Sequence, residues 1–168
     1  MKKLVFGLML SFLATVSINA QRIAVVDIDG ILESMSTYQD AQTELDKIAA
    51  QWRQDIAKEY DVIKSLYNKY QAEQVLLSEE QRKEKEDEIV EKEKMVRELQ
   101  KRRFGPDGDL FNKRQELISP IQDKVFFAIE DFAADRGYDL IFDKNGSTGL
   151  LFASEEFDKT ESIKKRIK

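Results

Sequence analysis

The residues best suited to catalysis lie directly after the first apolar stretch of the expected mature chain. The segment VVDIDG, at residues 25–30, places Asp27 and Asp29 two positions apart at the end of a short β-branched run. In such a pair one carboxylate can attack phosphorus while the second handles the proton of the leaving group, with Mg²⁺ neutralising the phosphate. The alternative is structural, because a carboxylate near the N-terminus of a following helix is stabilised by the helix dipole.

The rest of the chain favours the structural role for this pair. The segment is similar to the first motif of haloacid-dehalogenase-type phosphatases, but Ile31 stands where those enzymes usually carry Thr. That fold also needs further strands bearing a Ser or Thr, a Lys and an acidic pair, and the helical middle of the chain leaves no room for a doubly wound sheet. A phosphatase acting through Asp27 and Asp29 therefore ranks behind the functions considered below.

Composition argues against most other catalytic and metal chemistry. The 168 residues include no Cys and no His, which disfavours disulfides, a nucleophilic triad and a transition-metal site. Other carboxylate pairs, such as Glu79/Glu80 and Glu155/Glu156, lack the apolar sequence neighbours that acid–base catalysis requires. The net charge of −5 disfavours general binding of nucleic acid, which needs a concentrated cationic surface. We therefore expect a protein that is not an enzyme, with no cofactor, no metal and no nucleic-acid partner.

The N-terminus has the pattern of an export signal. Lys2 and Lys3 precede an apolar run at residues 4–16, and the small residue Ala20 is followed by a polar one. This pattern predicts a signal peptide, residues 1–20, cleaved after Ala20, and the apolar run is short for a membrane span. The mature chain is then an exported protein of the cell envelope, and it is more acidic still because two lysines are removed.

The middle of the chain is expected to form a long helical hairpin. Residues 31–104 contain no Gly or Pro and consist mainly of helix-favouring residues. One straight helix of that length would reach roughly 110 Å at 1.5 Å per residue, so we expect the segment to fold back. Ser78 followed by Gln81 matches a capping box and predicts the turn just before Ser78. The charged return helix is typical of a coiled-coil arm in solvent.

An apolar stripe rich in aromatic residues recurs at steps of three or four residues along the outgoing helix. Part of this stripe should pack on the return helix, which offers only a thin seam of Ile89, Val96 and Leu99. Some apolar surface should therefore be left for a protein partner. The candidate partner-facing residues are Trp52, Ile56, Tyr60, Ile63, Tyr67 and Tyr70.

The segment FGPDG, at residues 104–108, interrupts the return helix. Proline cannot donate the amide hydrogen bond of an interior helical position, and the glycines loosen the backbone. Gly105, Pro106 and Gly108 are therefore the candidate hinge. Helical periodicity resumes beyond them and continues to Gly137, the expected C-terminal cap.

Strand patterns occur only near the two ends of the mature chain. Residues 22–27 are β-branched, residues 138–143 alternate, and residues 149–153 follow a turn at 144–147. The last two segments predict a hairpin, and the first strand is expected to join it because a lone hairpin is marginally stable. Thr160 should cap a closing helix.

These elements together predict an α+β fold with two parts. Residues 21–40 and 118–168 are expected to form a small antiparallel-type β-sheet body from both chain ends, which is also the oligomerisation domain. Residues 41–117 are expected to form the α-helical hairpin arm, a coiled-coil tentacle.

The order of these features resembles the Skp (OmpH) family of periplasmic chaperones. The resemblance spans essentially the whole mature sequence, from the strand at residues 23–27 through the charged arms to LISPI at 117–121, RGYDLIFDK at 136–144 and DKT at 158–160. It implies a periplasmic homotrimer shaped like a jellyfish, with three sheets as the body and three hairpins around a cavity. Unfolded outer-membrane β-barrel proteins, the clients, would be held there without ATP until membrane insertion. The residues then expected in the trimer body are Ile23, Val25, Tyr138, Leu140, Phe142 and Leu151.

Two alternatives stay open at this point. A structural or adaptor coiled coil of the envelope could use the same arms to bind one folded partner without chaperone activity. Basic clusters, including residues 164–166, could also contact anionic membrane lipid or lipopolysaccharide, although function does not require this contact. Residues 78–103 carry nine basic and nine acidic side chains, so electrostatic capture at the arm tip is not expected and no lipopolysaccharide site is assigned.

Overall fold

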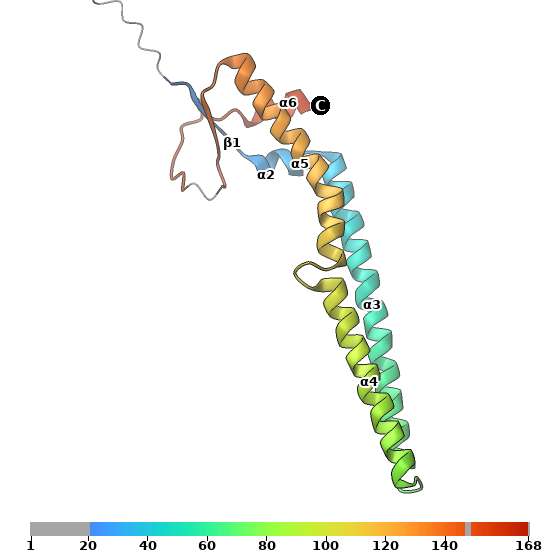
Figure 1. Cartoon of the computed structure of the whole chain (residues 1–168). Coiled ribbons are helices and arrows are strands. Elements are labelled where there is room, and N and C mark those ends of the chain that lie inside the picture. The colour runs from blue at the N-terminus through green and yellow to red at the C-terminus, as the bar shows by residue number, and fades with distance from the viewer. Residues whose placement is uncertain (1–20, 147–148, 168) are drawn as a thin grey trace, which may run out of the picture.

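The computed structural model describes residues 21–146 and 149–167, and the predicted signal peptide lies outside these residues. It shows one long helical arm attached to a small body that contains both ends of the described chain (Figure 1). None of the helices in this part of the chain combines the length and apolarity needed to cross a bilayer. In chain order the elements are β1 (Ile23–Val26), α2 (Ile28–Glu33), α3 (Ser36–Glu73), α4 (Glu79–Phe104), α5 (Asp109–Arg136), β2 (Leu140–Asp143) and α6 (Thr160–Ile167).

The predicted helical hairpin is confirmed. Helix α3 has 38 residues, which corresponds to about 57 Å, and α4 runs back beside it. The turn ends in the predicted capping box: Ser78 Oγ accepts from the Gln81 amide at 3.3 Å, and Gln81 Oε1 accepts from the Ser78 amide at 3.0 Å. The reversal is thus specified by contacts among neighbouring residues.

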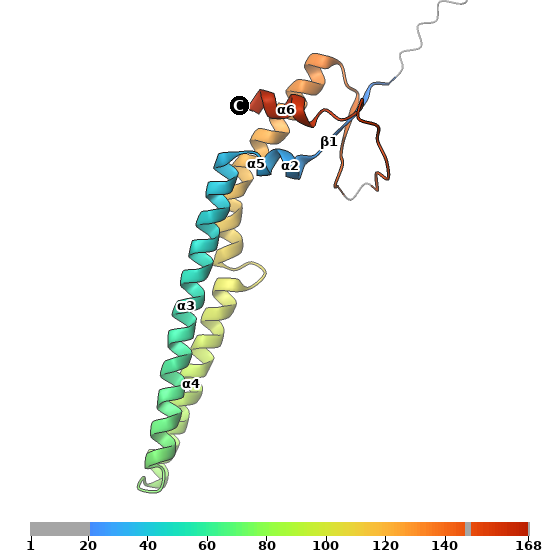
Figure 2. The same ribbon diagram turned by 180° about the vertical axis from the view of Figure 1, so that it is seen from behind.

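The chain returns to the body in two helices, because the loop at residues 105–108 separates α4 from α5 (Figure 2). Glycine is required here by close approach: a Cβ at Gly105 would lie 2.4 Å from the Lys101 carbonyl oxygen, and one at Gly108 would lie 2.7 Å from that of Arg102. An ion pair of 2.6 Å between Arg103 and Asp109 spans the loop. The predicted break is confirmed as an ordered turn between two helices.

The predicted antiparallel-type sheet is wrong, because β1 and β2 pair in parallel. Ile23 lies opposite Leu140 and Val26 lies opposite Asp143. Parallel strands need a long crossover, and helices α2 to α5 supply it by carrying the chain out along the arm and back to the same side of the body. The prediction failed because it took its strand directions from an expected hairpin between residues 138–143 and 149–153.

That hairpin does not form. Residues 149–153 have no regular secondary structure, and the segment that lines the second edge of β1 is instead 157–159. The Val25 amide donates to the Phe157 carbonyl at 2.9 Å, and the Lys159 amide donates to the Val25 carbonyl at 2.9 Å. Strand β1 is therefore the centre of the body, with neighbours on both edges.

The core of the body lies where α2, α5 and α6 cover the strands. Its buried members are Val26, Ile31, Leu32, Val125, Phe132 and Ile163. Helix α5 ends at Gly137, which has a φ of 67° and so adopts the left-handed conformation expected of a C-terminal cap. The reversal after this residue brings Tyr138 back onto α5, where its ring stacks on that of Phe132 at a centroid distance of 5.6 Å.

Candidate functional site

The apolar residues of the arm form two groups: some are buried between α3 and α4, and others remain exposed to solvent. Ile56 and Ile63 are buried between α3 and α4, where they form a cluster with Val96. Their spacing of seven residues places both on the face that contacts α4. Because their own arm encloses them, these two residues leave the set of candidate partner-facing side chains.

The tyrosines of the stripe lie at the edges of this seam, with their hydroxyls bonded to α4. Tyr60 donates to Gln100 at 3.3 Å and Tyr67 donates to Glu93 at 3.0 Å, while Tyr70 donates to Glu86. The hydrogen bond to Glu93 raises the pKa of the Tyr67 hydroxyl, and the bond to Glu86 does the same for the pKa of Tyr70. Tyr60 and Tyr67 nevertheless remain more than 40% exposed, so each ring offers apolar surface while its hydroxyl is held.

Trp52 lies at the joint between the two return helices rather than on open surface. Its ring meets Phe104 edge to face at a centroid distance of 6.2 Å, and the Arg103 guanidinium lies 4.4 Å from the Trp52 ring centre. The same Arg103 is paired with Asp109 across the break. Trp52 therefore helps to fix the geometry of residues 105–108, the candidate hinge.

The break also creates a groove that the sequence did not reveal. A cavity of about 780 Å³ lies between α4 and the loop at residues 105–108, with Met95, Val96, Leu99 and Pro106 among its apolar lining residues. Charged groups surround it, including the 2.7 Å ion pair between Lys92 and Glu59 that joins the two arm helices. A lining that combines apolar and charged groups suits a polypeptide segment that carries both apolar and polar side chains.

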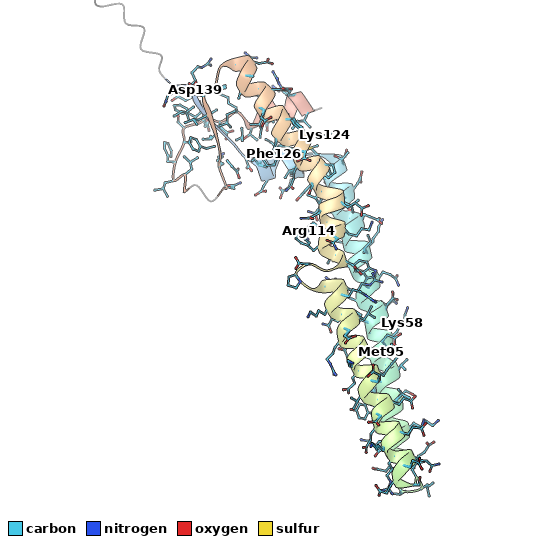
Figure 3. The ribbon with its side chains drawn as sticks, viewed as in Figure 1. Lys58, Met95, Arg114, Lys124, Phe126 and Asp139 are labelled. Carbon is cyan, nitrogen blue, oxygen red and sulfur yellow. The ribbon has the colours of Figure 1, made fainter. Side chains whose placement is uncertain are left out.

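Several exposed apolar side chains were missed by the sequence-based prediction. On the arm they include Val62, Val90 and Met95, which are 45%, 57% and 55% exposed. On α5 they include Phe126 and Phe127, which follow the fully buried Val125. Three consecutive apolar residues on a helix cannot all face one core, and this signal was available in the sequence. Figure 3 shows Met95 on α4 well along the arm and Phe126 on α5 where that helix reaches the body.

The candidate trimer-body residues also divide into enclosed and open positions. Val25 is 2% exposed in the single chain, so it leaves the set of candidate subunit contacts. Tyr138 and Phe142 are half-buried in their own chain. By contrast, Ile23 is 36%, Leu140 46% and Leu151 99% exposed. The open positions gather around β2 and the segment that follows it.

The aspartates of the VVDIDG segment do not form a catalytic pair. Asp27 is the N-cap of α2: its Oδ1 accepts from the Gly30 amide at 2.8 Å and from the Asn145 side chain at 2.9 Å. Asp29 lies in the first turn of the same helix, where the dipole favours a carboxylate. Within residues 21–146 and 149–167, His, Cys, Asp and Glu nowhere gather in a group of three that could hold a metal ion. The structural interpretation of the pair explains its position fully.

The chain thus consists of a small body of strands and helices that bears one long, highly charged helical hairpin with apolar side chains exposed along it. Over residues 22–167 the sequence matches the family described as Outer membrane protein (OmpH-like), and the chain belongs to this family. The OmpH-like family is a family of chaperones and not of enzymes, so the assignment supports a general chaperone role. It confirms the resemblance found in the sequence.

A solved structure has the same fold. It is the crystal structure of a candidate outer membrane chaperone (OmpH-like) from Caulobacter crescentus CB15, with a TM-score of 0.72 and 10% sequence identity. The alignment covers 88% of this chain and 84% of the other. No curated protein sequence matches this chain significantly.

Proposed function

We propose that this protein is an ATP-independent holdase of the periplasm, which binds unfolded outer-membrane β-barrel proteins in a cavity between helical arms and prevents their aggregation. The observation that carries the proposal is the set of apolar side chains exposed along a charged arm. Val62, Tyr67, Val90 and Met95 are each more than 40% exposed. A soluble protein that keeps such residues open along one element is suited to contacts with another polypeptide.

The chemistry of the arm favours weak and distributed binding. Each exposed side chain offers a small apolar contact, while the ion pairs around it, such as Lys85 with Glu88 at 2.9 Å, keep the surface hydrated. An unfolded client gripped at many weak points stays mobile but is kept from meeting other unfolded chains. The groove beside Met95 is one of the apolar surfaces that we propose for contact with such a segment.

We also propose that three copies associate through the body to form the cavity. Leu151 and Phe152 are 99% and 83% exposed, and Leu140 on β2 is 46% exposed. Large apolar side chains that are exposed on an edge strand and on the segment after it are suited to be covered by a second copy. A ring of three needs a head-to-tail contact, in which this surface of one copy meets a different surface of the next and the rotation between subunits closes the assembly.

The holdase proposal is tested by diluting a urea-unfolded outer-membrane porin with and without the purified mature chain and following light scattering. A threefold molar excess of subunits should suppress the scattering. Replacing Val90 by Ser and Met95 by Gln together should raise the concentration needed for half suppression at least twofold, because both side chains are exposed and apolar. The control Lys83→Gln, on the same helix, should leave it unchanged. If the unaltered protein does not reduce scattering, the holdase proposal is wrong and the adaptor alternative takes its place.

The trimer proposal is tested by sedimentation velocity. Leu140→Asp combined with Leu151→Asp should convert the assembly to monomers, because both side chains are open in the single chain. Val25 is unsuitable for this purpose, since a charge at that buried position would unfold the body. An unchanged mass for the double variant would exclude this surface as the subunit contact.

The loop at residues 105–108 is proposed as the hinge that adapts the cavity to clients of different size. Replacing its four residues by Ala-Lys-Glu-Ala should join α4 and α5 into one stiffer helix. Capture should then fall for large clients and persist for small ones. Equal capture of both by this variant would contradict a hinge.

A further inference from the structure

The body carries a basic pocket on a protein whose net charge is −5. Its volume is about 440 Å³, and its lining residues lie just before β1, at the end of α5 and in or just before α6. Figure 2 shows where these elements lie in the body. Five cationic side chains line it: Arg22, Arg136, Lys159, Lys165 and Arg166. No carboxylate is among its lining residues in the part of the chain that the structure describes.

Most of these cations lack an ionic partner. Arg166 pairs with Asp135 at 2.5 Å, but no ion pair within residues 21–146 and 149–167 involves the other four. Arg22 donates to the Arg136 carbonyl and Lys159 donates to the Glu156 carbonyl, and both acceptors are neutral. The positive charge of the pocket is therefore left largely uncompensated.

On the arm, too, only part of the cations are paired. Lys58, Lys85 and Arg97 each pair with a carboxylate one helical turn away, at 2.9 to 3.3 Å, whereas no ion pair among the described residues involves Lys47 or Arg114. What distinguishes the pocket is that its cations gather at one place from residue 22, residue 136 and residues 159–166. The tertiary fold thus brings like charges together, and a bound anion would offset their repulsion.

Two of the guanidinium groups are held in place by aromatic rings of the same pocket. Arg22 lies 4.8 Å from the centre of the Tyr138 ring, and Arg166 lies 5.7 Å from that of Phe132. These contacts reduce the freedom that each arginine would lose on binding a ligand. Guanidinium groups held in this way suit the tetrahedral oxygens of a phosphate, to which arginine donates paired hydrogen bonds.

We propose that this pocket is a binding site for a phosphate group, either of a soluble phosphorylated compound or of an anionic lipid headgroup. A terminal phosphate carries close to two negative charges at neutral pH and the phosphodiester of a lipid headgroup carries one, so either group would offset part of the charge of the four unpaired cations. Ser162, also in the lining, adds a hydroxyl that can donate to a phosphate oxygen. The site lies on the body and is separate from the arm surfaces proposed for clients.

The experiment uses the mature chain and two probes, inorganic pyrophosphate in calorimetric titration and phosphatidylglycerol vesicles in co-sedimentation, with phosphatidylcholine vesicles as the neutral comparison. The pocket variant is Arg136→Gln with Lys165→Gln; both side chains are exposed, and the Arg136 carbonyl that anchors Arg22 is retained. The matched control is Lys47→Gln with Arg114→Gln, two exposed cations on the arm helices that change the net charge equally. If the double variant does not fold, the single variant Lys165→Glu replaces it as the pocket variant in both binding measurements.

At least a tenfold loss of affinity is expected in the pocket variant, with the control unaffected. Binding of pyrophosphate identifies a soluble phosphate compound as ligand, and binding of phosphatidylglycerol vesicles alone identifies a lipid headgroup. Suppression of porin aggregation should persist in the pocket variant, which separates this site from the proposed holdase surface. The proposal is overturned if neither probe binds, or if both variants lose affinity equally.

Discussion

Replacing Ile63 by Ala is expected to open the outer part of the arm while the body stays folded. Ile63 is 5% exposed and belongs to a cluster with only two other buried members, Ile56 and Val96. The body has its own larger cluster around Val125 and Ile163. Because these clusters share no residue, loss of packing in the arm should not spread to the body.

The expected loss of free energy on replacing Ile63 by Ala depends on how closely other side chains surround it. Truncation of a buried isoleucine to alanine costs about 2–5 kcal/mol, and the lower part of this range applies where neighbours can collapse into the space. Two helices in contact along one seam can move together more readily than a closed core, so we expect about 2–3 kcal/mol. That free energy corresponds to a roughly 30- to 150-fold increase in the population of the opened arm.

Hydrogen exchange measured by mass spectrometry reads this opening separately in each part of the chain. Peptides from residues 56–73 and 89–103 should exchange faster by that factor, while peptides from residues 121–136 should be unchanged. Val62→Ala is the matched control, since Val62 is the adjacent residue on the same helix and is 45% exposed. Its effect should be within about 0.5 kcal/mol.

Two results would refute the reasoning. If Ile63→Ala accelerates exchange equally in the arm and the body, the molecule unfolds as one cooperative unit and the clusters are not independent. If it accelerates neither beyond the control, the seam contributes little and another interaction holds the arm helices together.

Three further predictions concern the body. Burial alone would raise the pKa of Asp158, but hydrogen bonds from Lys144 and Thr160 outweigh it and lower the pKa to about 2. This carboxylate therefore stabilises the fold above about pH 4. Its contribution, about 1–2 kcal/mol after allowance for partial exposure, is lost as the pH falls from 4 to 2. Asp158→Asn should remove this fall in the free energy of urea unfolding between pH 4 and pH 2, and an unaltered pH profile would count against these hydrogen bonds. Gly137→Ala places a Cβ on a residue with a φ of 67° and should lower the free energy of unfolding by about 1 kcal/mol, which corresponds to a melting temperature lower by about 2–4 °C. An equal or higher melting temperature would mean that the helix cap accommodates the Cβ without strain. Asp27→Ala removes the side-chain cap of α2 and should cost about 1 kcal/mol in urea unfolding; if stability is unaffected, the bond to the Gly30 amide is not the reason for an aspartate at this position.

The correct sequence-based predictions rest on contacts between residues close in the chain. The capping box at Ser78, the left-handed Gly137 and the break at residues 105–108 each involve groups within a few positions of one another, so the local sequence contains both partners. Asp27 belongs to the same class, because the amide that it accepts from is three residues away. These signals were sufficient to predict a helical hairpin between two strand-forming ends.

The failed and missing predictions concern partners far apart in the chain. The sequence predicted that the strands form a hairpin at residues 138–153, which β1 joins. In the structure, residues 157–159 instead lie along the second edge of β1, where the backbone amide and carbonyl of Val25 both form hydrogen bonds with them. The stripe on α3 was treated as one surface, but the facing position of Val96 decides that Ile56 and Ile63 are enclosed while Tyr60 and Tyr67 stay open. Periodicity in the sequence shows which residues share one face of a helix, but it does not show how much of that face a partner helix buries.

The charged helical hairpin, the positions of its turn and its break, and the resemblance to one family of chaperones could all be predicted from the amino-acid sequence. The parallel direction of the strands, the groove beside Met95 and the gathering of cations around Arg136 required the folded structure. Caps, turns and helical periodicity depend on interactions between residues that are close in the chain, whereas strand pairing, burial and pockets depend on where distant segments meet.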